Sequence, residues 1–221
     1  MPDAHGSKIE LVIFDCDGVL VDSEPIANRT LTAALIAEGL EISEAEVTRV
    51  TTGLSLSSVL DWLAADHGLR LGEDFLAALQ DVTFAAFRRD LQAVPGAPEA
   101  VAAIHKNGLK ACVASSGEIA KMTLTLGLCG LYEAFAGRLF SATWVPHGKP
   151  APDVFLFAAR EMGVAPSRCL VIEDSLPGIA AAQAAGMAVL GYGGNELAAA
   201  GAQVFADIRE LPDLLACLAD G

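Results

Sequence analysis

Short apolar runs, each separated from the next by a helical pattern, constrain this chain more than any other feature. The clearest runs span 9–14, 109–114 and 169–173, and weaker ones span 138–142, 187–192 and 202–206. A continuous apolar run of this length is typical of a strand buried on both faces of a parallel sheet. Prolines near the starts and glycines at the ends delimit the helices between the runs. This alternation predicts an α/β fold with a Rossmann-like parallel sheet.

Residues 26–92 interrupt the alternation, because they contain helical patterns and no strand-like run. Prolines and a glycine flank this segment on both sides, as is typical of hinges. We therefore expect a helical domain of residues 25–93, inserted after the first strand. Residues 1–24 and 94–221 would then form the α/β core.

Composition narrows the classes of function. Hydrophobic residues make up 53% of the 221 residues, which excludes disorder, and the formal net charge is −14. Such an acidic chain without a basic run is a poor partner for nucleic acid. A small anionic substrate would need local positive charge, such as a bound cation. The N-terminus lacks a signal pattern, and prolines and glycines break the longest uncharged stretch, so we expect a cytoplasmic protein with no membrane partner.

Polar residues gather where the expected strands end. In an open parallel sheet, ligands bind outside the carboxyl ends of the strands. Each piece alone has a structural explanation as a turn, a helix N-cap or a favourable charge at a helix start. Their occurrence together, in order, instead favours one catalytic site. The residues are Asp15, Asp17 and Gly18 after the first run, Ser115 and Ser116 after the second, Lys149 in a proline-bounded loop, and Glu173 and Asp174 after the third.

The same residues carry a resemblance to a known family. The stretches FDCDGVLVDSE, GKPAPDVF and VIEDSLPGIAAAQAAGM, with Ser115 between the first two, resemble the haloacid dehalogenase-like phosphohydrolases. The nearest similarity is to the branch of beta-phosphoglucomutase-like proteins and sugar-phosphate phosphatases. The resemblance implies that the helical insert is a small cap domain. It also implies phosphoryl transfer rather than dehalogenation, because dehalogenases need no acid two residues after the nucleophile.

The resemblance assigns roles that agree with the chemistry of the residues. Asp15 would attack phosphorus to form an aspartyl-phosphate, and Asp17 would act as the general acid and base. Mg2+ would be the cofactor, since hard cations prefer oxygen ligands. The implied metal ligands are Asp15, Asp174 and the backbone carbonyl of Asp17, with Glu173 nearby, and the implied phosphoryl-binding groups are Ser115, Ser116 and Lys149.

Hydrolysis and phosphate migration on a sugar remain the two main alternatives. Mutases of this branch resemble D-T-x-x-x-H after the first motif, whereas Ala27 stands here at the histidine position. Their cap loop also presents a basic residue, and the segment 51–58 has none. Both differences favour a phosphatase acting on a small sugar, polyol or sugar-acid phosphate. A beta-phosphoglucomutase-type mutase is the alternative, and an inactive member that only binds phosphorylated ligands is a remote one.

The residues that would contact the rest of the substrate are open at this point. Thr52, Gly53 and Ser55 are candidates at the edge of the expected cap, although a helix-capping loop explains them equally well. His147 and the arginines Arg88 and Arg89 are weaker candidates, with a loop and a solvated helix face as the alternatives. We expect a monomer, because the cap itself would shield the site.

Overall fold

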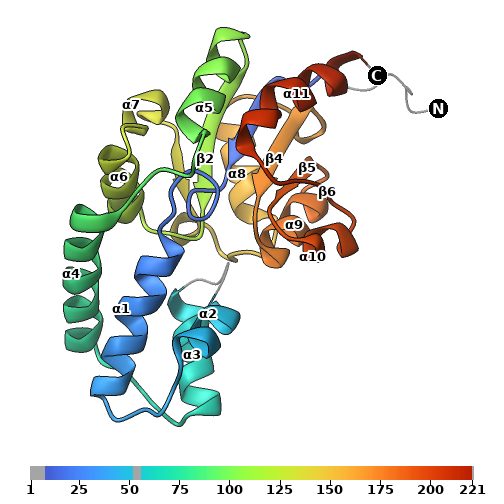
Figure 1. The fold of residues 1–221 in the computed structure, drawn as a ribbon. Coiled ribbons are helices and arrows are strands. Elements are labelled where there is room, and N and C mark those ends of the chain that lie inside the picture. Colours follow the sequence, from blue (N-terminus) through green and yellow to red (C-terminus); the bar gives the residue numbers. More distant parts are fainter. Residues whose placement is uncertain (1–7, 52–55, 221) are drawn as a thin grey trace.

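The protein is described by a computed structural model that covers residues 8–51 and 56–220 (Figure 1). Its centre is a parallel sheet of six strands. The strands are β1 (Leu11–Phe14), β2 (Lys110–Ser115), β3 (Leu139–Ser141), β4 (Cys169–Glu173), β5 (Ala188–Tyr192) and β6 (Gln203–Phe205). Their order is β3-β2-β1-β4-β5-β6, and every neighbouring pair is parallel. The predicted α/β fold is confirmed.

Helices cover both faces of this sheet. The core helices are α5 (Ala97–Lys106), α6 (Ile119–Leu128), α7 (Tyr132–Phe135), α8 (Asp153–Glu161), α9 (Leu176–Ala184), α10 (Asn195–Ala199) and α11 (Leu211–Asp220), with short 3-10 turns η1 (Ala142–Trp144), η2 (Pro166–Arg168) and η3 (Ile208–Glu210). Alternate strand residues point to opposite faces. Val12 and Phe14 pack in the cluster that contains α5, α6 and α11, whereas Leu11 and Ile13 pack with α8 and α9. All four residues are fully buried, which explains the continuous apolar run.

The segment after β1 is helical. It contains α1 (Glu24–Ala37), α2 (Glu44–Thr51), α3 (Leu56–Asp66) and α4 (Glu73–Asp90). Helices α1 and α4 lie side by side, with α2 and α3 at the end of the molecule far from α5 and α11 (Figure 1). A separate apolar cluster built on Leu35, Val47 and Leu63 stabilises these helices. This cluster supports the division at residues 24/25 and 93/94, which stays a prediction.

None of the helices in ranges 8–51 and 56–220 has the length and apolar character needed to cross a membrane.

Candidate active site

The strand order places the polar strand ends next to one another. Asp15 directly follows β1, the central strand between β2 and β4. The backbone N–H of Asp15 donates to the carbonyl oxygen of Ile172 at 2.9 Å, so the ladder with β4 continues into the site. Ser115 ends β2 and Glu173 ends β4. Three adjacent strands thus deliver Asp15, Ser115 and Glu173 to one edge of the sheet.

Lys149 joins two of these carboxylates in a buried ion-pair cluster. Its Nζ donates to Oδ1 of Asp15 at 2.6 Å and to Oε2 of Glu173 at 2.7 Å. The side chains of Lys149, Asp15 and Glu173 are only 2%, 9% and 1% exposed. Burial alone would lower the pKa of Lys149, but the two carboxylates outweigh it and raise that pKa. Lys149 therefore brings a permanent positive charge to Asp15.

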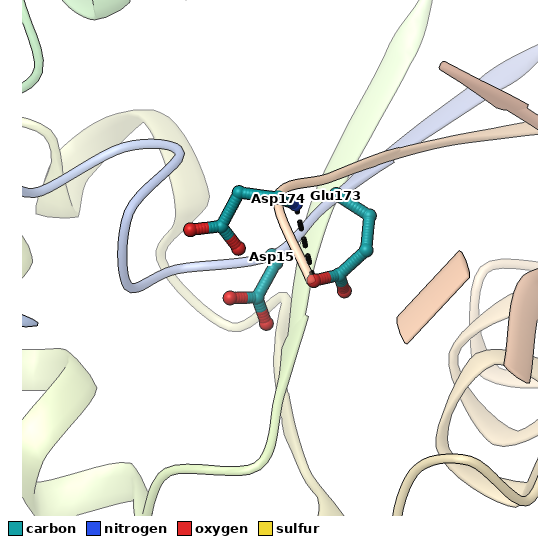
Figure 2. A group of neighbouring side chains, drawn as sticks. All are labelled: Asp15, Glu173 and Asp174. Atoms are coloured by element: carbon teal, nitrogen blue, oxygen red, sulfur yellow. Dashed lines mark hydrogen bonds between the residues drawn. The ribbon is translucent and has the colours of Figure 1, made fainter. Parts of the chain in front are cut away.

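Glu173 is held by more than Lys149. Its Oε1 accepts hydrogen bonds from the backbone N–H of Asp174 at 3.2 Å and from the backbone N–H and hydroxyl of Ser175 at 3.1 and 2.7 Å. Figure 2 shows the bond to the Asp174 backbone. A Cβ on Gly178, in the first turn of α9, would overlap the Glu173 carboxylate, so this close packing requires glycine there. These contacts fix Glu173 as the group that positions Lys149.

The carboxylates of Asp15, Glu173 and Asp174 form an acidic cluster (Figure 2), in which one oxygen from each lies within 4.8 Å of the others. The Asp174 carboxylate has no hydrogen-bond donor among residues 8–51 and 56–220. Burial raises the pKa of Asp174 well above its usual range, and the charges of Glu173 and Asp15 add to the effect. Burial also raises the pKa of Asp15 to about 7, helped by Glu173 and Asp17 and opposed by Lys149. The raised pKa values show that the ionised forms of these carboxylates are destabilised, and a nearby cation would stabilise them. Because all the ligand atoms are oxygens, the cluster fits a hard divalent cation.

Asp17 faces a different set of partners. Its Oδ1 accepts a hydrogen bond from the Ser23 hydroxyl, and its Oδ2 pairs with Lys121 Nζ at 2.9 Å. Burial alone would raise the pKa of Asp17, but Lys121 and Ser23 outweigh it and hold that pKa below its usual range. Asp17 thus has its own counter-ion, separate from Lys149.

The sequence reasoning missed Lys121. It is the third residue of α6, so its positive charge lies in the first helical turn, where the helix dipole disfavours a cation. A lysine in that position indicates a nearby negative charge that compensates. This signal was available in the sequence.

A cavity of about 200 Å³ opens above these groups. It is lined by both Asp15 and Asp17, both lysines, the strand-end groups Ser115, Ser116, Glu173 and Asp174, and residues of α1 and α2 that include Asn28 and Thr51. Asn28 and Thr51 are further polar groups that the sequence reasoning missed, because their approach depends on how α1 packs against α2. The cavity has the polar floor and helical wall expected for a small phosphorylated ligand.

A second cavity of about 500 Å³ adjoins the first and shares Asp17, Ala27, Leu31, Ser116 and Lys121 with it. The rest of its wall is mostly apolar and comes largely from α1, α3 and α4. The apolar lining residues are Ala27, Leu31, Leu60, Leu76, Leu79, Phe84 and Phe87. A ligand bound near Asp17 can thus extend toward either a polar or an apolar wall.

The remaining sequence candidates have different outcomes. Thr52, Gly53 and Ser55 fall outside the described residues. The side chain of His147 is 75% exposed and pairs with Asp153, and it lines neither cavity. The cap arginines Arg88 and Arg89 are exposed at the end of α4 and line neither cavity.

Comparison with known proteins points to one family. The profile of the haloacid dehalogenase-like hydrolases matches residues 9–186. The 6-phosphogluconate phosphatase of Escherichia coli K12 is 32% identical over 184 residues, which cover 83% of this chain and 82% of that protein. Hexitol phosphatase B of the same organism is 33% identical over 190 residues, covering 81% of this chain and 82% of that protein.

Solved structures agree. A haloacid dehalogenase family hydrolase from Deinococcus radiodurans, with bound phosphate and sodium, is 34% identical. It superposes with a TM-score of 0.77, and the match covers 96% of this chain and 97% of that chain.

Proposed function

Because the chain belongs to the haloacid dehalogenase-like hydrolase family, we propose that it is a Mg2+-dependent phosphatase that works through an aspartyl-phosphate. Its substrate class is a small sugar, polyol or sugar-acid phosphate. The observation that carries the proposal is the buried Asp15 carboxylate, 2.6 Å from Lys149 and within the acidic cluster, on the floor of a cavity. Two relatives named for phosphatase activity on 6-phosphogluconate and on hexitol phosphates support the substrate class.

In this proposal an oxygen of Asp15 attacks phosphorus, and the bond from phosphorus to the ester oxygen breaks as the new bond forms. Asp17 is ionised in the free protein, but the negative charge of a bound phosphate would raise its pKa, so that it takes up a proton as the substrate binds, gives it to the departing alkoxide and later takes one from the water that attacks the aspartyl-phosphate. That second attack breaks the bond between phosphorus and the Asp15 oxygen, releases inorganic phosphate and restores the carboxylate. Lys121 and Ser23, bonded to Asp17, hold it in position between the two steps.

Electrostatic repulsion sets the main barrier to approach. A carboxylate about 4 Å from a phosphate dianion feels two repulsive interactions of ~4 kcal/mol each at an effective dielectric near 20. Lys149 opposes this repulsion, and the hydroxyl of Ser115 and the backbone N–H of Ser116 are suited to bind phosphoryl oxygens. The residues that would hold Mg2+ are Asp15, Asp174 and the Asp17 carbonyl, with Glu173 beside them holding Lys149. When bound, Mg2+ supplies two further positive charges at the same point.

Hydrolysis is favoured over the mutase reaction by the wall of the cavity. Ala27 lines both cavities at the position where the mutase pattern has a histidine. A methyl group there cannot exchange protons with Asp17 or bind a second phosphate. The mutase reaction on beta-glucose 1-phosphate remains the alternative activity.

The test measures phosphate release from a panel of sugar, polyol and sugar-acid monophosphates, with Mg2+ or with EDTA. Asp15→Asn is the inactive variant, and Asp90→Asn is the matched control, because Asp90 pairs with Arg89 on an exposed helix end. We expect release that requires Mg2+, disappears in Asp15→Asn and is unchanged in Asp90→Asn. Conversion of beta-glucose 1-phosphate to glucose 6-phosphate without phosphate release would establish the mutase instead.

A further inference from the structure

Asn28 stands out among the residues on the cap side of the cavity. It lies in the first half of α1, is 7% exposed, and lines the same cavity as Asp15 and Asp17. Its Oδ1 accepts a hydrogen bond from the hydroxyl of Thr51 at 2.8 Å. The two N–H groups of its amide have no acceptor among the described residues. The Asn28 nitrogen is not a buried atom left without a partner, but a ligand that covers it in the cavity without supplying an oxygen would leave a polar donor unpaired, which is costly, so a ligand that does supply an oxygen gains affinity.

Thr51 fixes which end of the amide is available. It is the last residue of α2, and its hydroxyl also lies 2.9 Å from the carbonyl oxygen of Val47, one turn earlier in that helix. The single hydroxyl hydrogen of Thr51 is within bonding distance of both the Val47 carbonyl oxygen and the Asn28 oxygen, and when it is shared with the Asn28 oxygen the N–H end of the amide is left for a ligand. Thr51 is thus a positioning residue for Asn28.

The charged groups around this cavity limit which oxygen-bearing group of a ligand can bind beside Asn28. The cations that line this cavity in ranges 8–51 and 56–220 are Lys121 and Lys149, and both are paired with carboxylates. Glu24 adds a negative charge to the wall. A second anionic group on the substrate would meet this charge without a free cation, whereas a neutral hydroxyl would not.

We propose that Asn28 determines specificity by donating a hydrogen bond to a neutral hydroxyl of the leaving group. The enzyme then prefers phosphates of polyols and neutral sugars to those of sugar acids. This inference rests on the proposed phosphatase function and narrows its substrate class. A site that donates to a substrate hydroxyl discriminates strongly against the analogue that lacks it, because its polar group is then left without a partner.

The experiment compares three esters of six carbons each with the full chain and Mg2+. Sorbitol 6-phosphate carries hydroxyls on the other five carbons, 6-phosphogluconate has a carboxylate in place of the terminal CH2OH group, and hexyl phosphate has neither hydroxyl nor carboxylate. The test variant is Asn28→Leu. A second single variant, Thr51→Val, removes the hydroxyl that orients the Asn28 amide. Thr32→Val is the matched control, because Thr32 is equally buried in α1, does not line the cavity, and among the described residues its hydroxyl bonds the backbone oxygen of Asn28, at 2.7 Å.

We expect Asn28→Leu to lower kcat/KM for sorbitol 6-phosphate by about 10- to 100-fold and to change that for hexyl phosphate by less than about threefold. Thr51→Val should lower the preference for sorbitol 6-phosphate over hexyl phosphate by a smaller factor, and Thr32→Val should leave this preference unchanged. The wild-type protein should hydrolyse sorbitol 6-phosphate faster than 6-phosphogluconate.

Several outcomes overturn the inference. An equal loss of kcat/KM on sorbitol 6-phosphate and hexyl phosphate in Asn28→Leu would show that Asn28 has a structural role. Faster hydrolysis of 6-phosphogluconate than of sorbitol 6-phosphate by the wild type would refute the preference for neutral leaving groups. Hydrolysis of hexyl phosphate alone by the wild type would refute the inference while the phosphatase function stands. Silence on all three esters would refute both.

Discussion

The two ends of the cavity are built in opposite ways. At the sheet end, Asp15, Lys149 and Glu173 form a buried charged cluster in which every group has a short contact. At the helical end, the larger adjoining cavity has a largely apolar wall, and in the smaller cavity Asn28 offers amide hydrogens that no described residue accepts. The ion pairs of Lys149 at the sheet end are formed before a ligand arrives, whereas the Asn28 amide at the helical end is left to bond a ligand.

This difference matches the tasks of the two ends under the proposed function. A transferring phosphoryl group is the same in every phosphate ester, so preorganised charge can serve all substrates. The leaving group varies, and a wall of helices can change without disturbing the sheet. Changes at the sheet end should therefore have large effects on all substrates, and changes at the helical end should have smaller effects that depend on the substrate.

Lys149→Met should have the largest effect, because it removes the cation from the charged cluster. We expect kcat to fall by about 10³-fold on every substrate. We also expect stability to fall by about 3 kcal/mol, since two buried carboxylates lose their partner. The checks are steady-state kinetics and urea unfolding in EDTA.

Lys110→Met is the control for that variant. Lys110 is exposed, and among the described residues its Nζ donates to the carbonyl oxygen of Met162, at 3.1 Å, and to no carboxylate. Its loss should change stability by less than about 0.5 kcal/mol. Similar losses in both variants would contradict a special role for the cluster.

Gly18→Ala should have the next largest effect. Gly18 has a φ of +76°, and a Cβ there would overlap the Asp174 carboxylate. Displacing Asp174 should weaken Mg2+ binding and lower kcat/KM by about 10²-fold on all substrates. Gly108→Ala is matched, because Gly108 has the same φ of +76° but open space around its Cα. Titration calorimetry with Mg2+ separates the overlap from the backbone strain, and equal effects of the two changes would argue against a metal role for Asp174.

The sheet end was largely predictable from the sequence, because each part follows a strand. Asp15, Ser115 and Glu173 close apolar runs that the sheet must bury, and parallel strands end at one edge. The predicted parallel sheet, which the structure confirms, therefore places these three residues at the same edge. Lys149 lies in a loop, and its proline-bounded place between the second and third runs predicted it at this edge, whereas the family resemblance assigned it to the phosphoryl oxygens.

The helical end was not predictable in the same way. The bond between Asn28 on α1 and Thr51 on α2 depends on how two helices pack, and no local pattern encodes that angle. Thr52, Gly53 and Ser55, predicted as cap contacts, lie outside the described residues and stay predictions. Lys121 could have been found from its unfavourable place in the first turn of α6.

Lys121→Met tests the boundary between the two ends, because Lys121 lines both cavities and pairs with Asp17. Loss of this positioning contact should lower kcat by about tenfold, a part of what general acid and base catalysis supplies. Stability should fall by about 1.5–3 kcal/mol at neutral pH, the range of a hydrogen bond to a charged group. Activity assays and urea unfolding without metal measure both.

The stability loss in Lys121→Met should depend on pH with a definite sign. The pKa of Asp17 is lowered in the folded protein, so its pairing stabilises the fold above the ordinary aspartate pKa of about 4 and is lost as the pH falls through the lowered value. The pKa of Lys121 is raised, so Lys121 stays charged over this range. The difference between wild type and variant should therefore be full near neutral pH and shrink in acid. A difference that grows as the pH falls would contradict the ion pair.

Phe84→Leu should have the smallest effect and the clearest dependence on substrate. Phe84 lines only the larger cavity and packs against Phe87, with ring centroids 6.3 Å apart. A smaller side chain there should lower kcat/KM for esters with a bulky apolar leaving group by about fivefold, the low end of one contact in a hydrophobic pocket. The effect on glycerol phosphate should be negligible, because a three-carbon leaving group is too short to reach this wall. Phe157→Leu is the control, because Phe157 packs against Phe140 and Trp144 and lines neither cavity. A uniform loss across all esters in Phe84→Leu would show that the helical end, like the sheet end, acts on the phosphoryl group itself.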